Sequence, residues 1–252
     1  MLELDGGDAG GGYLRLALAL SALTDRSVRV ENVRGDRPDP GLKPQHCAAV
    51  EAAAAVCDAT VTGDDPGATT VTFEPETRPG GRAAVDVETA GSVALVFDTV
   101  LPMALAADAP IRLRATGGTD VAWSPPLVTN RRVKLPLVRQ FGIPAAVDVD
   151  RRGFYPVGGG AATLTVAPAT CRPLALGTRG EPAGVRVYSL ASDDLADAEV
   201  AERQAEAAVE RLQATDRRVR ERVVSYVASD SPGSVCAVRA DYENGLAGLD
   251  AL

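Results

Sequence analysis

The chain has 252 residues, 46% hydrophobic and 24% charged, which is enough to bury one sizeable core and a small additional domain. Its net charge of −8 argues against broad electrostatic attraction to nucleic acid, and no apolar run approaches the ~18 residues of a membrane span. Residues 1–7 lack the basic and apolar regions of a secretion signal, so we predict a cytoplasmic globular protein with no membrane segment.

The cationic residues are almost all arginine. Only Lys43 and Lys134 are lysines among 26 cationic residues, whereas aspartate and glutamate number 34. This composition is typical of a halophilic protein, although a GC-rich genome would also raise the arginine content. At about 1 M salt the Debye length falls to about 3 Å, so phosphate has to be held by direct two-point contacts, which arginine provides.

Residues 1–75 predict a β-α-β-α-β-β unit. Alternating and helical apolar patterns place its elements, in order, at 2–5 (strand), 13–24 (helix), 28–34 (strand), 44–58 (helix), 60–63 and 69–74 (strands). Residues 83–168 repeat the order at 84–88 (strand), 92–107 (helix with a kink at Pro102), 111–116 (strand), 126–141 (helix), 145–150 and 161–167 (strands). We therefore predict an α+β fold in which residues 1–172 contain two repeats.

The remaining residues, 173–252, predict a smaller α/β domain. The segment "EPAGVRVYSL" is typical of a strand, residues 196–214 of a charged helix, and residues 219–228 and 234–242 of two further strands. The charged pairs of this helix, such as Glu199 with Arg203, are most simply a solvated face.

A small cationic cluster stands out in residues 34–46, "RGDRPDPGLKPQH". Pro44 suits the first helical turn, so Gln45 and His46 fall at the positive end of the helix dipole, close to Lys43. Cations at that end are unfavourable unless an anion lies between them, so the cluster predicts a phosphate site.

Arg15 extends this prediction to the preceding helix. It follows the glycine run 10–12, whose free backbone N–H groups also suit an anion. The alternative is that the glycines only make a tight turn, and that the single histidine, His46, is structural.

Several motifs then resemble, in order and spacing, the RNA 3′-terminal phosphate cyclase family. They are "LDG", the triple glycine with "LR", "VRGDRPDPGLKPQH", "TAGS", "GGTDVAWSPP" and "RRGFYPVGGG", spread from Met1 to about Ala167. The resemblance implies β-α-β-α-β-β repeats with a smaller inserted domain. It also implies conversion of an RNA 3′-phosphate into a 2′,3′-cyclic phosphodiester with ATP and a divalent metal, Mg or Mn. In this reaction AMP passes from an enzyme histidine to the RNA 3′-phosphate, which the ribose 2′-hydroxyl then attacks.

Carried over by position, the resemblance implies that five residues hold the phosphate end of the RNA or the nucleotide: Arg15, Arg34, Arg37, Gln45 and His46. It further implies that the segment 123–126, including Pro125, lies near the adenine of ATP. The alternative is that Trp123 and the two prolines simply precede a helix.

The chain departs from the family pattern at two positions of the expected nucleotide site. Ala9 replaces the glutamate that precedes the family's triple glycine, which leaves Asp8 as a substitute metal ligand. Asp98 replaces a nucleotide-contacting glutamine, and we expect this carboxylate near the triphosphate to need a metal beside it.

No residue matches the family's adenylylated histidine, because His46 aligns with the phosphate pocket. We therefore expect a truncated cyclase that is inactive alone. The alternatives are a non-catalytic cyclase-like protein that binds RNA or acts in ribosome assembly, and a bare anion-binding module. Enolpyruvyl transferases have similar repeats, but their lysine-rich sites fit poorly with two lysines.

Overall fold

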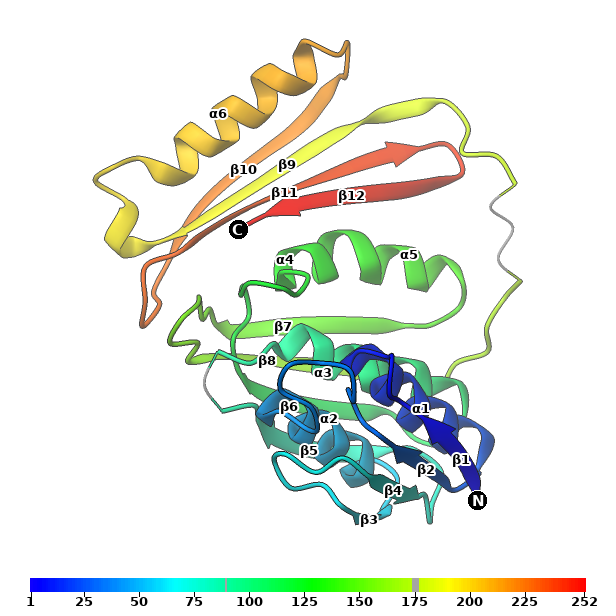
Figure 1. Cartoon of the computed structure of the whole chain (residues 1–252). Coiled ribbons are helices and arrows are strands. Elements are labelled where there is room, and N and C mark those ends of the chain that lie inside the picture. The colour runs from blue at the N-terminus through cyan, green and yellow to red at the C-terminus, as the bar shows by residue number, and fades with distance from the viewer. Residues whose placement is uncertain (89, 174–176) are drawn as a thin grey trace.

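The computed structural model describes residues 1–88, 90–173 and 177–252, and contains three four-stranded sheets (Figure 1). Thr89, the first residue of the "TAGS" motif, lies outside the described residues. The first sheet and its helices consist of β1 (Leu2–Asp5), α1 (Gly11–Thr24), β2 (Val28–Glu31), α2 (Pro44–Ala55), β3 (Thr60–Thr62) and β4 (Val71–Glu74).

The second sheet belongs to residues 81–166. Its elements are β5 (Gly81–Asp86), α3 (Val93–Val100), η1 (Leu101–Leu105), β6 (Ile111–Gly117), α4 (Leu127–Thr129), η2 (Asn130–Lys134), α5 (Leu135–Gln140), β7 (Ala145–Arg151) and β8 (Gly160–Val166). The strand orders β1-β2-β4-β3 and β5-β6-β8-β7 are equivalent. In each sheet the first pair is parallel and the other two pairs are antiparallel, so the predicted repeat and the α+β fold class are confirmed.

One hydrophobic core serves both repeats. Leu18 of α1 and Phe73 of β4 belong to the same buried cluster as Phe97 of α3 and Leu164 of β8. Helix α3 is buried along most of its length, and α2 packs against both α1 and α3. This packing brings the first turns of α1, α2 and α3 close together, which positions the candidate site.

The third sheet is formed by residues 182–251. It consists of β9 (Pro182–Ser192), η3 (Asp193–Leu195), α6 (Val200–Gln213), β10 (Val219–Val227), β11 (Ser234–Tyr242) and β12 (Gly245–Ala251), in the order β10-β9-β11-β12. Helix α6 covers one face of this sheet, and the other face lies toward α4, α5 and β7 (Figure 1). A second hydrophobic cluster joins Val128 and Phe154 of the repeats to Tyr188 and Val235 of this sheet.

Three predicted elements differ from the observed ones. The strand expected at 28–34 ends at Glu31, because Asn32 and Arg34 have positive φ angles. The helix expected at 126–141 is α-helical only at its ends, with π-helical turns in η2 just before Pro136, which has no N–H to donate. The helix expected at 92–107 becomes a 3₁₀-helix at Leu101, beside Pro102.

No helix within the described ranges is both long enough and apolar enough to cross a membrane.

Candidate anion-binding site

The N-termini of three helices meet at one place in the repeat domain. A Cβ atom added to Gly11, the first residue of α1, would lie only 2.0 Å from Nε2 of His46 in the first turn of α2. The neighbouring Gln45 accepts a hydrogen bond through Oε1 from the backbone N–H of Ser92, the N-cap of α3, at 3.3 Å. The positive ends of three helix dipoles therefore point to a common region.

Two arginines extend to the same glycine turn. A Cβ at Gly10 would lie 3.3 Å from Nη2 of Arg37, and a Cβ at Gly12 would lie 3.7 Å from Nη2 of Arg15. Gly10 caps α1 without any side-chain hydrogen bond, and the first turns of α1 and α2 contain no acidic residue. Cations and helix N-termini repel each other here unless an anion lies between them, so the geometry suits a phosphate.

His46 is held in its neutral form at this point. Its side chain is 8% exposed, and Nδ1 accepts a hydrogen bond from the backbone N–H of Lys43 at 3.0 Å. Burial, followed by the positive charges of Arg34, Arg15 and Lys43, lowers the pKa of His46 to about 4. Since Nδ1 is an acceptor in the neutral ring, Nε2 carries the proton and is a hydrogen-bond donor facing the α1 turn.

Arg34 shapes the loop that carries the other cations. It has a φ of +56° and donates through Nη1 to the carbonyl oxygens of Asp39, at 2.9 Å, and Gly41, at 2.8 Å. In the same loop, Lys43 forms an ion pair with Asp39. Arg34 is close enough to His46 to lower the pKa of the imidazole, but one of its nitrogens is already occupied by the loop.

Asp98 lies beside this site on α3, and it already has partners. Its Oδ1 is 2.5 Å from Nζ of Lys134 and accepts a hydrogen bond from Nδ2 of Asn130 at 3.3 Å. It also partly offsets the lowering of the Arg15 pKa by burial. Asp98 is therefore partnered within the protein, and its place beside the triphosphate and a metal stays a prediction. Asn130 and Lys134 were not predicted from the sequence; they lie four residues apart, on one helical face.

Asp8 lies in a separate, shallow depression of about 550 Å³ that Asp5, Asn32 and Asp36 also line. The nearby Asp5 Oδ1 already accepts hydrogen bonds from the backbone N–H of Gly7, at 3.0 Å, and from Nδ2 of Asn32, at 3.1 Å. Within residues 1–88, 90–173 and 177–252, no group of three His, Cys, Asp or Glu side chains could hold a metal ion. The residues present therefore do not form a protein-only metal site.

Two residues of the segment expected near the adenine, Trp123 and Pro125, are exposed, and Pro126 is buried. Trp123 is 90% exposed, has a φ of +62°, and packs edge-to-face on Tyr155 with ring centroids 6.0 Å apart. Pro125 is exposed just before α4. In the described part of the chain, no hydrogen bond or ion pair joins Pro125 to the glycine turn, and its role toward ATP stays a prediction.

Two of the recognised motifs make a buried structural contact. Arg152 of "RRGFYPVGGG" donates through Nη1 to both carboxylate oxygens of Asp120 in "GGTDVAWSPP", at 3.0 and 2.7 Å. Thr119 donates to Asp120 and accepts from the backbone N–H of Gly153. These side chains fasten the end of β6 to the loop between β7 and β8.

Comparison with known proteins gives the family. The sequence profile of the RNA 3′-terminal phosphate cyclase family matches residues 7–240. A protein of that name from Halobacterium salinarum is 46% identical over 263 aligned residues, covering 100% of this chain and 75% of the relative. Proteins of the same name from Archaeoglobus fulgidus and Methanopyrus kandleri are 40% and 42% identical, covering 98% and 83% of this chain and 74% and 60% of those relatives. The chain therefore belongs to the RNA 3′-terminal phosphate cyclase family.

Proposed function

We propose that the region where α1, α2 and α3 begin binds the 3′-phosphate of an RNA that is to be cyclised. The convergence of Arg15, Arg37 and the Nε2 atom of His46 on the Gly10–Gly12 turn carries this proposal. These groups provide two cations and one neutral donor, and α1 adds backbone N–H groups that no side chain caps. Such a set matches the several oxygens of a terminal phosphate, which carries more negative charge than an internal phosphodiester.

The proposed reaction is the formation of a 2′,3′-cyclic phosphodiester at the RNA 3′ end. AMP from ATP is joined to the RNA 3′-phosphate with release of pyrophosphate. The 2′-hydroxyl oxygen then loses its proton and bonds to the 3′ phosphorus, and the bond from that phosphorus to AMP breaks, so that AMP leaves. Arg15 and Arg37 would neutralise the phosphate oxygens and hold them in fixed geometry while charge is redistributed. His46, being neutral, would donate a hydrogen bond without adding charge. Gln45 would act indirectly, through its contact with α3.

ATP and a divalent metal complete the proposal. Asp98 and Pro125 are the candidate nucleotide contacts, and Arg34 holds the loop that carries Arg37. Magnesium is commonly bound by one or two carboxylates together with substrate phosphates, so Asp8 stays a candidate although the residues that the structure describes form no metal cage of their own.

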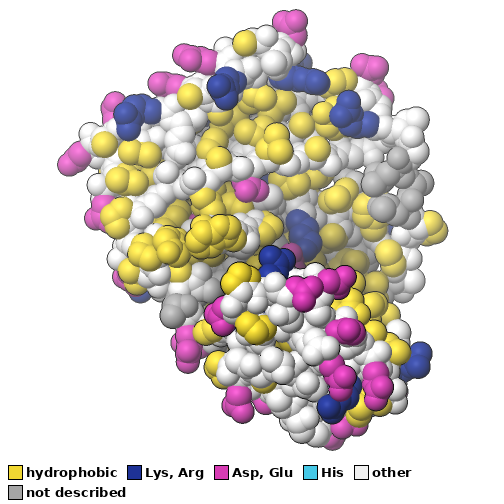
Figure 2. Space-filling view, viewed as in Figure 1, with side chains coloured by type: hydrophobic (Ala, Val, Ile, Leu, Met, Phe, Trp, Pro, Cys, Tyr) yellow, Lys and Arg dark blue, Asp and Glu magenta, His cyan; other side chains and the backbone are white. Residues whose placement is uncertain are grey.

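The nucleophile that accepts AMP is not identified among the residues of the site. His46 is the chain's single histidine, and it is buried with Nδ1 occupied and Nε2 against α1. No histidine is visible on the face of the molecule shown in Figure 2. We therefore expect this chain alone to bind the RNA end without becoming adenylylated. The division into residues 1–172 and 173–252 and the cytoplasmic location also stay predictions.

The test compares two RNA oligonucleotides of equal sequence, one with a 3′-phosphate and one with a 3′-hydroxyl, by fluorescence anisotropy. Tighter binding of the 3′-phosphate by the wild type, lost in Arg37→Ala, supports the site. A non-catalytic RNA-binding role would give equal affinity for both ends. The relatives, which are named as cyclases, favour the first outcome.

A further inference from the structure

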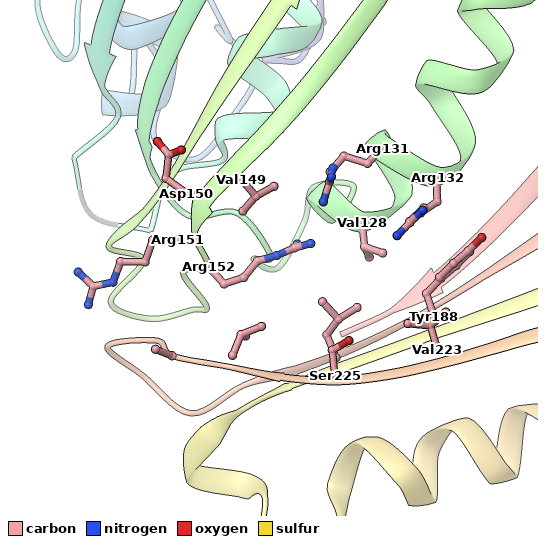
Figure 3. Close-up of a pocket in the computed structure, with 13 residues that line it drawn as sticks. Val128, Arg131, Arg132, Val149, Asp150, Arg151, Arg152, Tyr188, Val223 and Ser225 are labelled. Carbon is pink, nitrogen blue, oxygen red and sulfur yellow. The ribbon is translucent and has the colours of Figure 1, made fainter.

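A second concentration of arginines lies between the repeat domain and the third sheet. It lines a cavity of about 420 Å³ (Figure 3). Side chains reach it from α4 and η2, from the end of β7, and from the open face of β9 and β10. The lining residues include Val128, Arg131, Arg132, Asp150, Arg151, Arg152, Tyr188, Leu190, Val223, Ser225 and Val227.

The carboxylates near this cavity do not neutralise all of the arginines that line it. Figure 3 shows the guanidinium groups of Arg131, Arg132 and Arg152 directed toward the cavity, whereas Asp150 and Arg151 point away from it. Asp150 pairs with Arg114, and Arg151 pairs with Asp230, outside the cavity. Arg152 is neutralised by the buried Asp120.

Arg131 and Arg132 have no such neutralisation. Among the described residues, neither guanidinium has a carboxylate within 4.0 Å. Arg131 is half-buried; that burial, Arg152 and Arg132 lower its pKa, and the carboxylate of Asp148 raises it. Arg132 beside it is exposed. Two cations held close together, one of them partly out of water, favour the binding of an anion between them.

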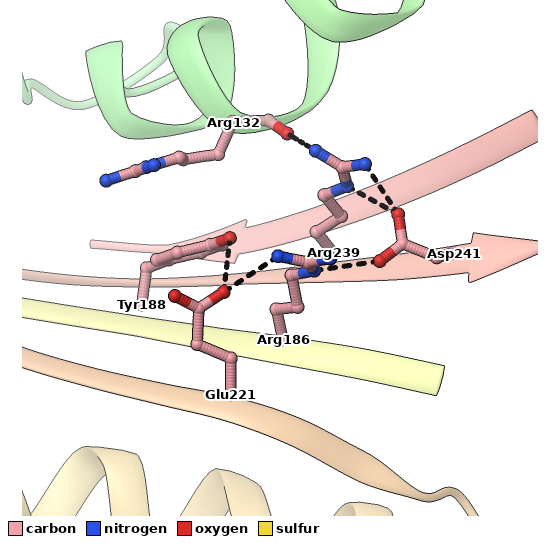
Figure 4. A network of polar contacts seen from close by, with 6 residues as sticks. All are labelled: Arg132, Arg186, Tyr188, Glu221, Arg239 and Asp241. Atoms are coloured by element: carbon pink, nitrogen blue, oxygen red, sulfur yellow. Dashed lines mark hydrogen bonds and ion pairs between the residues drawn. The ribbon is translucent and has the colours of Figure 1, made fainter. Parts of the chain in front are cut away.

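Two arginines of the third sheet, Arg186 and Arg239, do form ion pairs with carboxylates. Figure 4 shows Arg186 bound to both Glu221 and Asp241, and Arg239 bound to Asp241 and to the backbone oxygen of Arg132. The carboxylates thus neutralise Arg186 and Arg239, which do not line the cavity. Arg131 and Arg132, which do line it, have no such partner among the described residues.

The lining suits an anion that carries an organic group. Arg132 lies over the ring of Tyr188, with its central carbon 4.9 Å from the ring centroid, which fixes the plane of the guanidinium. Val128, Leu190 and Val223 supply apolar walls, and Ser225 adds a hydroxyl. Arginines match phosphate oxygens by paired hydrogen bonds, and the walls can pack against a sugar or a base.

The segment η2 links this cavity to the first site. Asn130 and Lys134 contact Asp98 on the side of the glycine turn, while Arg131 and Arg132 face the cavity. An α-helix with its side chains is about 10–12 Å across, so the two groups of cations lie at least about one helix diameter apart. At the rise of about 3.4 Å per nucleotide of a stacked strand, this distance takes three or more nucleotides.

We propose that the cavity lined by Arg131 and Arg132 binds a backbone phosphodiester of the RNA a few nucleotides before its 3′ end. This inference rests on the proposed function, because it requires the RNA terminus to lie at the glycine turn. It makes the third sheet a second RNA-contacting part of the protein.

The test measures the affinity of the full chain for 3′-phosphate oligonucleotides of two, four and eight nucleotides over a range of potassium chloride concentrations. Wild type is expected to bind the eight-nucleotide RNA at least tenfold more tightly than the dinucleotide. In Arg131→Gln/Arg132→Gln this gain is lost, the salt dependence of the longer RNA becomes shallower, and the dinucleotide affinity is unchanged. Arg203→Gln/Arg211→Gln, which removes two exposed arginines on α6, is the charge-matched control and should behave like wild type.

A second variant, Ser225→Asp, places a carboxylate in the cavity and should reproduce the loss without removing an arginine. An unchanged gain with length in both variants would overturn the inference. Free AMP that removes the gain by competition would also overturn it, since a mononucleotide would then be the occupant. The proposed function fails on a different result, equal wild-type affinity for 3′-phosphate and 3′-hydroxyl dinucleotides.

Discussion

Gly11 of α1 and His46 of α2 approach each other so closely that no side chain fits between them. A Cβ at Gly11 would lie 2.0 Å from Nε2 and 2.7 Å from Cδ2 of the imidazole. We predict that Gly11→Ala displaces His46 and lowers the free energy of unfolding by about 1–3 kcal/mol, as overpacking commonly does. Urea unfolding measures the change, and binding of 3′-phosphate RNA should weaken at the same time.

Gly12→Ala is the matched control for that variant. Its Cβ would meet Nη2 of Arg15 at 3.7 Å, an ordinary contact, and alanine favours a helix over glycine by up to about 1 kcal/mol. It should fold as stably as wild type or more so. Equal effects of the two substitutions would show that the His46 contact does not limit residue size at Gly11.

The stability of the protein should depend on pH through His46. Its pKa is about 4 in the folded protein and 6.5 without the fold, so between these values the unfolded chain binds more protons. The free energy of unfolding therefore falls as the pH is lowered from about 6.5 to 4. The loss attributable to His46 is up to about 3 kcal/mol, at about 1.4 kcal/mol per pH unit. Urea unfolding of wild type and His46→Gln at several pH values measures it, and identical slopes would contradict the assignment.

We predict that Arg34 contributes more to the stability of its loop than to the binding of the phosphate. Arg34→Gly loses the hydrogen bonds to the carbonyl oxygens of Asp39 and Gly41, which we expect to cost about 1–3 kcal/mol of unfolding free energy. Arg34→Ala loses the same bonds and keeps the strain of the positive φ, about 1 kcal/mol, which arginine also bears and glycine avoids. Thermal unfolding should rank the proteins as wild type, glycine variant, alanine variant. A glycine variant as stable as wild type would show that the loop does not need the arginine.

Asp98 should weaken anion binding, because its negative charge lies near Arg15. We expect Asp98→Asn to bind 3′-phosphate RNA several-fold more tightly at low salt, with the difference shrinking as salt is added. Asp194→Asn makes the same change in net charge at an exposed position on η3 and is the control. Weaker binding by Asp98→Asn would mean instead that the Lys134 contact is needed to hold the site.

Local sequence signals predicted most of the fold. The helix at Pro44 begins where proline and the apolar pattern indicate, and the strands of both repeats were placed within a few residues. Strand β12 was missed because Gly245–Ala251 is rich in glycine and alanine and contains no β-branched residue. Its conformation depends on pairing with β11, which the sequence of the segment does not specify.

The sequence indicated the clustered charges of the candidate site but not the partners that lie far apart in the chain. Arg37 and His46 lie close together in the sequence, and a helix start between them suggested an anion. The contact of Asp98 with Asn130 joins residues 32 positions apart, and the one with Lys134 depends on the same packing. Such contacts follow from how α3 and η2 pack, so no local pattern could have indicated them.

The most direct test of the account is the affinity of the chain for an RNA oligonucleotide that ends in a 3′-phosphate, relative to the same RNA with a 3′-hydroxyl. We predict tighter binding of the phosphate end, and a loss of about 1–3 kcal/mol of that preference in Arg37→Ala, the range for hydrogen bonds to charged groups. Equal affinity of the wild-type protein for both ends would contradict the assignment of Arg15, Arg37 and His46 to the RNA terminus.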